Sequence, residues 1–126
     1  MKRRAIYISQ FSHSNPIPNA ARIGPIVASG LIRGVDPVTH KFPASLEEQC
    51  AHMFANIQHT VEAAGATLDD IIKVTFWMNP IVRGPINTEW TKMFPDAELR
   101  PARQVMESPM ELGVLIQCDF LAVVGA

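Results

Sequence analysis

The spacing of apolar residues predicts one long amphipathic helix in the middle of the chain. Apolar side chains recur at helical intervals at Leu46, Cys50, Met53, Phe54, Ile57, Val61 and Ala64. The opposite face carries Glu48, His52, His59 and Glu62. Ser45 and Glu48 have the spacing of a capping box, and Gly65 supplies a C-terminal cap. We therefore predict a helix that begins after Ser45 and ends before Gly65.

Apolar runs on either side of this helix predict strands. They span residues 4–10, 23–32, 71–78, 103–107 and 114–124. Strict alternation within 71–78 places Ile71 on the opposite face from Ile72 and Val74. A second, shorter helix is predicted to open at Pro85 and to end before Pro95. The predicted order is β-β-α-β-α-β-β, which indicates an α+β fold.

The segments between these elements have turn and loop chemistry. Residues 12–19 contain Pro16 and Pro18 among Ser, His and Asn residues, which predicts a stiff loop. Turns are also predicted at 34–41 and 67–70, and a loop at 108–113.

The composition changes this picture in one respect. The 126 residues predict a single domain, residues 1–126, with 48% apolar and only 18% charged residues. Soluble domains typically have about 25% charged residues, so this chain has more apolar surface than a small monomer hides easily. Residues 114–124 are apolar on both faces except at Gln117 and Asp119. Two helices cover one face of a sheet, so we expect partner subunits to cover the other.

The charge balance and the cysteines narrow the classes of function. The 11 Lys and Arg residues against 12 Asp and Glu residues give a net charge of −1, which disfavours nucleic acid as a partner. Apolar runs are shorter than a membrane span requires, and the basic start lacks the apolar stretch of a signal peptide. Cys50 and Cys118 lie in apolar segments. They are interpreted as reduced core thiols of a cytoplasmic protein in preference to a disulfide.

Two charged residues are candidates for chemistry. Asp119 lies inside the apolar run 114–124, where a carboxylate needs a partner or a wet cleft. One interpretation is a structural carboxylate that accepts hydrogen bonds from backbone amides or pairs with an arginine. The other is a general acid/base, because burial shifts the pKa of a carboxyl group toward the useful range. Arg103 follows Pro101, which fixes the direction of the chain. Its planar guanidinium suits a small carboxylate, although a structural arginine is the alternative.

The remaining candidates are weaker. His13, in the stiff loop, is kept as a possible site residue. His52 and His59 lie about 10 Å apart along one helix and are interpreted as solvated. No Cys and His spacing suggests zinc, and no phosphate-binding or nucleophile-elbow motif occurs. Ser29 has no base near it in sequence.

Several segments together resemble the Rid family (also called YjgF/YER057c/UK114). The resemblance runs from about Ile23 to Val123. Its motifs are Val27-Ala28-Ser29-Gly30, Glu48-Gln49, the block from Val61 to Thr75, Asn87, Arg100-Pro101-Ala102-Arg103 and Leu121-Ala122-Val123. It implies a chorismate-mutase-like fold, with a six-stranded mixed sheet and two helices on one face. It also implies a homotrimer with a central barrel and sites between neighbouring subunits.

The resemblance also assigns roles to residues. Arg103 matches the arginine that binds the substrate carboxylate, and Gly30, after Ser29, matches a backbone position lining the pocket. Val105 falls where the family offers a main-chain carbonyl, and Asn87 matches an asparagine of the second helix. Asp119 falls where active members carry a glutamate that positions water. The implied activity is hydrolytic deamination of an enamine or imine resembling 2-aminoacrylate or 2-iminobutanoate, without metal or cofactor.

Two departures from the family pattern keep alternatives open. The segment Ser12 to Pro18 lacks the tyrosine of active members, and aspartate is one methylene shorter than glutamate. A carboxylate displaced by about 1 Å can cost roughly 10²-fold in rate. One alternative is therefore a pathway-specific deaminase of a larger aminated dicarboxylate. Another is a non-catalytic trimer that binds a small carboxylate or a partner protein, and RNA cleavage is a third.

Overall fold

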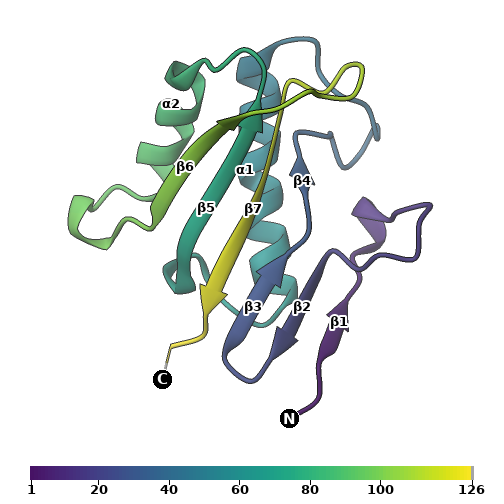
Figure 1. Cartoon of the computed structure of the whole chain (residues 1–126), viewed down its shortest axis with the longest axis vertical. Helices are drawn as coiled ribbons and strands as arrows, with labels where there is room; N and C mark the ends of the chain where they lie inside the picture. Colours follow the sequence, from purple (N-terminus) through teal and green to yellow (C-terminus); the bar gives the residue numbers. More distant parts are fainter. Residues whose placement is uncertain (126) are drawn as a thin grey trace.

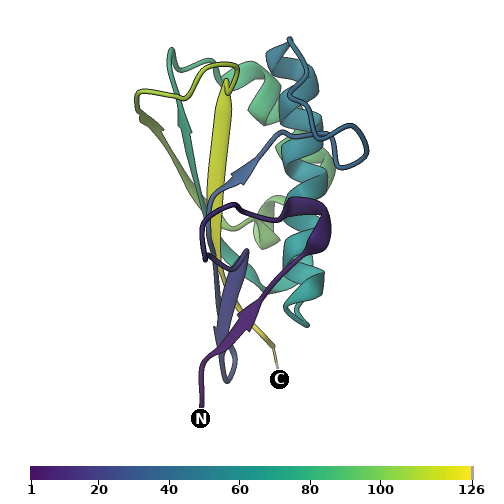
Figure 2. The same ribbon diagram turned by 90° about the vertical axis from the view of Figure 1, so that its right-hand side faces the viewer.

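A mixed β-sheet with both helices on one of its faces forms the body of the protein (Figures 1 and 2). The computed structural model describes residues 1–125. The strands are β1 Arg4–Ile6, β2 Ala20–Ile23, β3 Ile26–Ser29, β4 Ile32–Arg33, β5 Ile71–Met78, β6 Ala102–Glu107 and β7 Ile116–Val123. The helices are α1 Leu46–Ala63 and α2 Arg83–Met93, and short 3₁₀ turns occupy Ser9–Phe11, Leu68–Asp70 and Ala97–Leu99.

The strand order is β1-β2-β3-β7-β5-β6, and β4 also pairs with β7. β3 and β4 pair with successive parts of β7, so seven strands occupy six positions across the sheet. β5 and β6 are parallel, and all other pairs are antiparallel. The predicted α+β architecture, with a mixed sheet and two helices on one face, is confirmed.

The prediction of one strand over residues 23–32 is wrong, because the chain turns back there. β2 and β3 form a hairpin in which Ile23 pairs with Ile26. Gly24 has φ 53°, the left-handed conformation that a two-residue hairpin turn needs at its first position. The first predicted strand also ends early, at Ile6, and a 3₁₀ turn replaces its second half.

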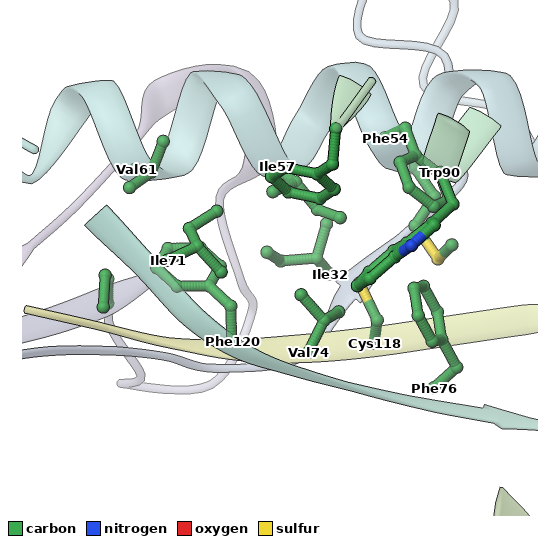
Figure 3. Close-up of a cluster of buried hydrophobic side chains, with 14 of the residues drawn as sticks. Ile32, Phe54, Ile57, Val61, Ile71, Val74, Phe76, Trp90, Cys118 and Phe120 are labelled. Atoms are coloured by element: carbon green, nitrogen blue, oxygen red, sulfur yellow. The ribbon is translucent and has the colours of Figure 1, made fainter. Parts of the chain in front are cut away.

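Helix α1 has the ends that the sequence predicted. The Ser45 hydroxyl accepts a hydrogen bond of 3.1 Å from the Glu48 amide, and Gly65 has φ 78° after the last turn. Its apolar side chains lie against those of the sheet in the core (Figure 3). The predicted apolar stripe is buried, with only Leu46 partly exposed.

One buried polar side chain, Gln49, connects the start of α1 to the loops beside it. Gln49 is fully buried; its Nε2 donates to the carbonyls of Pro43 and Gly113, each at 2.8 Å. Its Oε1 accepts from the Leu115 amide at 2.9 Å. Gly34 lies directly against the backbone of this same residue. The first turn of α1 is therefore tied to the segment just before it, to Gly34, and to residues 113–115, which are distant in sequence.

Strand β5 departs from strict alternation at its start. A register shift between Ile71 and Lys73 turns both Ile71 and Val74 toward the helices, with exposed fractions of 4% and 0%. Ile72 is 48% exposed as a result. The prediction that Ile72 shares a face with Val74 is wrong, because the bulge shifts the alternation by one residue.

The sheet face away from the helices carries exposed apolar side chains. Val27 and Ala122 pair across β3 and β7 on the buried side, so their neighbours Ile26, Leu121 and Val123 point the other way. Ile23, Ile26, Leu121 and Val123 are between 37% and 52% exposed. The apolar excess of the composition therefore has a location on this open face.

The cysteines are free thiols in the core, as predicted. Cys50 and Cys118 are fully buried, and burial raises the pKa of Cys50 to about 12. Within residues 1–125, no helix is long and apolar enough to cross a membrane.

Candidate functional site

Arg103 lies on the edge strand β6 and points toward helix α2. Its Nη2 donates a hydrogen bond to Oδ1 of Asn87, and its Cζ lies 5.1 Å from the centre of the Trp90 ring. Trp90 is only 7% exposed and packs edge-on against Phe94, with ring centres 4.9 Å apart. A guanidinium held by an amide and an aromatic ring has few orientations left, so its free donors point in a defined direction.

Asp119 lies on the opposite face of the sheet. Its neighbours Cys118 and Phe120 point into the core (Figure 3), so alternation along β7 turns Asp119 to the open face. Burial raises the pKa of its carboxyl group, and the positive charge of Lys73 partly offsets this effect. The carboxylate therefore holds its proton more tightly than an exposed aspartate does.

A polar row crosses the open face at Asp119. In register, Asp119 pairs with Thr75 of β5, and Thr75 pairs with Gln104 of β6. The Thr75 hydroxyl accepts a hydrogen bond of 3.3 Å from Gln104 Nε2. Thr75 is one of the few polar side chains that are buried, at 8% exposed. This row could not be predicted from the sequence, because its members belong to three separate strands.

The structure brings some of the predicted residues together and separates others. Arg103 and Asn87 are in direct contact, whereas the sheet itself lies between Arg103 and Asp119. Within one chain the arginine and the carboxylate therefore do not face a common cleft. Val105 is half-buried on β6 two residues after Arg103, and its side chain packs against the core. As an edge strand, β6 leaves the main-chain groups of its outer side unpaired by β5.

Ser29 and Gly30 serve local structure at the end of β3. The Ser29 hydroxyl accepts from the Phe120 amide at 2.8 Å, and the Gly30 amide donates to the Asn19 carbonyl at 2.9 Å. A Cβ at Gly30 would lie 3.6 Å from the nearest carbonyl oxygens, an ordinary contact. The amide of Gly30 is thus already used, which leaves its carbonyl for a ligand.

A cavity of about 410 Å³ lies between the loop after β1, strand β4 and helix α1. His13, the histidine singled out from the sequence, lines it. The other lining residues include Phe11, Asn15, Ile17, Leu31, His40, Phe42 and Asn56. The sequence indicated neither His40 nor Asn56 as lining residues. Across residues 1–125, no group of three or more His, Cys, Asp or Glu side chains has an arrangement that could hold a metal ion.

Comparison with known proteins shows to which family the chain is similar. The family model described as endoribonuclease L-PSP matches residues 9–124. A RutC family protein of Aquifex aeolicus is 32% identical over 98 residues, which cover 75% of this chain and 78% of that protein. A RutC family protein of Pyrococcus abyssi is 28% identical over 110 residues, which cover 85% of each chain.

Solved structures of other proteins superpose on nearly the whole length of this chain. A "probable translation initiation inhibitor" from Rhodopseudomonas palustris superposes with a TM-score of 0.89 at 26% identity, covering 99% of this chain and 100% of that one. A member of the conserved Rid protein family from Yersinia pestis has a TM-score of 0.88 at 23% identity, covering 98% and 100%. These matches fit the predicted chorismate-mutase-like fold. The chain therefore belongs to the endoribonuclease L-PSP family, which is the Rid family that its motifs indicated.

Proposed function

We propose that this protein hydrolyses the C=N bond of a small imine, or of the enamine in equilibrium with it, that carries a carboxylate. The observation that carries the proposal is the guanidinium of Arg103. Asn87 and Trp90 hold it, and it makes no ion pair with a carboxylate of residues 1–125. A half-buried arginine without an acidic partner is suited to a carboxylate from outside the chain.

The reaction needs one water molecule and no further reactant. The enamine takes up a proton at carbon and loses one from nitrogen to give the imine, and the oxygen of water then adds to the imine carbon while nitrogen is protonated. The carbon–nitrogen bond breaks, ammonia leaves, and a keto acid remains. Arg103 would fix the orientation of the substrate through its carboxylate. Asp119 would position the water and move its proton, a role that suits a carboxyl group with a raised pKa.

We propose that neighbouring copies complete the site in a homotrimer. Strand β6, with Arg103, and the β1–β2 side, with the loop 12–19, form opposite edges of the sheet (Figure 1). In a head-to-tail ring the β6 edge of one copy meets the β1–β2 edge of the next, which would bring Arg103 of one copy toward the loop 12–19 of another and toward Gly30, which is bonded to Asn19. In this proposal Asp119 faces the same site from the open face of the sheet. The exposed apolar residues of the open face support such an assembly, since contact between copies would bury them.

The test is the release of ammonia and keto acid from 2-aminoacrylate or 2-iminobutanoate that a second enzyme generates in situ. We expect the wild-type protein to accelerate release over buffer and Arg103→Gln to lower kcat/KM by about 10²-fold, because the substrate loses its anchor. Lys92→Gln is the matched control, since Lys92 lies on α2 and pairs with Glu89. Absence of acceleration, or equal rates in both variants, would contradict the proposal.

Replacing Asp119 by asparagine is expected to affect activity and stability in opposite directions. Loss of the acid/base group should lower kcat by about 10²-fold. A carboxyl group whose folded-state pKa exceeds its ordinary 3.8 stabilises the folded protein below that pH. This contribution is lost as the pH rises through the raised value. Asp119→Asn should therefore melt at a higher temperature, relative to wild type, at pH 7 than at pH 3. A pH-independent difference in melting temperature between the two proteins would refute the stability argument.

A second candidate function is binding of a small carboxylate without turnover. The observation that favours it is the sheet between Arg103 and Asp119 in one chain. Thermal stabilisation by 2-oxobutanoate that Arg103→Gln removes, together with no ammonia release, would support it. The name of the family model also makes RNA cleavage a candidate, and degradation of RNA lost in Arg103→Gln would identify that activity.

A further inference from the structure

We propose that Arg83 is a second anion-binding residue beside Arg103, and that the preferred substrate is therefore the imine or enamine of a dicarboxylate. The inference rests on the proposed function, because it extends the site of Arg103. It concerns the first turn of helix α2, the helix whose Asn87 and Trp90 contact Arg103 of strand β6.

Arg83 lies on the stripe of α2 that contacts Arg103. Arg83, Asn87 and Trp90 follow one another at intervals of four and three residues, which places them on one face of the helix. The last two are the residues that hold the Arg103 guanidinium. One helical turn, about 6 Å of rise, separates Arg83 from Asn87. Arg83 is exposed at this position.

Neither arginine is compensated by a carboxylate of the described chain. The ion pairs within residues 1–125 join Arg33 to Glu111 and Lys92 to Glu89. Glu107, four residues after Arg103 on β6, makes no ion pair with either arginine. Burial lowers the pKa of Arg103, and the positive charge of Arg83 lowers it further. Two like charges at one place are unfavourable, and a bound anion would remove this repulsion.

The chemistry of the two guanidinium groups indicates the ligand. Arg103 spends one donor on Asn87 and keeps the rest of its planar fork for the carboxylate next to the C=N bond. Arg83 would then bind a second carboxylate about one helical turn away. A monocarboxylate leaves Arg83 unpaired, so the two arginines favour a ligand with two carboxylates over a ligand with one. With a net charge of −1, the chain offers little other attraction for RNA phosphates.

The test compares the binding of two keto acids to the intact protein by isothermal titration calorimetry. The probes are 2-oxobutanoate, with one carboxylate, and 2-oxoglutarate, with two. We expect wild type to bind 2-oxoglutarate at least tenfold more tightly than 2-oxobutanoate. Arg83→Gln should reduce this ratio to about one, whereas Lys92→Gln, with the same charge change on the same helix, should keep the wild-type ratio.

The outcomes separate this inference from the proposed function. Binding of both acids with equal affinity, lost in Arg103→Gln, would overturn the role of Arg83 and leave the proposed function standing. A wild-type preference that Arg83→Gln preserves would also overturn it. No binding of either acid would contradict both proposals. Another outcome is a wild-type protein that shows no preference between the acids and binds an RNA oligonucleotide that neither arginine variant binds. That result would instead identify the two arginines as a phosphate-binding site.

Discussion

Replacing Gln49 with leucine is expected to lower the free energy of unfolding by about 4 kcal/mol, one of the two largest effects predicted for this protein. The side chain makes three hydrogen bonds with backbone groups of Pro43, Gly113 and Leu115. Leucine has a similar volume and removes all three bonds. The three bonds are partly buried, and each backbone group that loses its partner out of reach of water costs about 1–3 kcal/mol, while the extra apolar contact of leucine offsets part of this.

Urea unfolding followed by circular dichroism measures the loss. Gln58→Leu is the matched control, because Gln58 is an exposed residue of the same helix, and its replacement should change stability by less than about 0.5 kcal/mol. If both variants lose the same small amount, the loops are held by other contacts and Gln49 is not their anchor.

The second large effect is expected at Gly34, where alanine should cost about 3 kcal/mol or more. A Cβ at this position would lie 2.2 Å from the Gln49 carbonyl oxygen and 2.7 Å from its carbonyl carbon. These are backbone atoms of α1, so no rotamer change relieves the overlap, and the helix must move away from the sheet. The position is buried, and the cost is purely steric, because the glycine is not in the left-handed conformation.

Gly84→Ala is the control for this substitution. A Cβ at Gly84, in the first turn of α2, meets nothing within 4 Å. That variant should be as stable as wild type or slightly more stable, since alanine favours helix. A melting temperature of Gly34→Ala close to that of Gly84→Ala would show that α1 adjusts at little cost.

The sequence predicted those elements whose signals are local. Helix α1 carries its own cap residues and apolar stripe, and β5 has the predicted bounds. The hairpin at Gly24 was missed because a continuous apolar run hides a two-residue turn. The bulge after Ile71 was missed because only the pairing with β7 sets the register of β5.

At the candidate site, too, the sequence indicated individual residues but not the contacts that depend on the fold. The resemblance indicated Arg103 and Asn87, and the structure places them in contact. It did not indicate that Trp90 lies beneath the guanidinium, because a tryptophan at helical spacing is typical of a core. It also could not show on which face of the sheet each residue lies, since that depends on how strands β6 and β7 pair with β5.

The register of β7 determines both which of its side chains lie in the core and which lie at the candidate site. This strand pairs with β3, β4 and β5, and its side chains alternate between Cys118 or Phe120 inside and Asp119 outside. A slip of one residue would exchange these sets, placing a charge in the core and a large aromatic ring on the open face. Misregistered chains are thus penalised during folding by the same carboxylate that the reaction would use, so selection for activity at this position also selects for correct strand pairing.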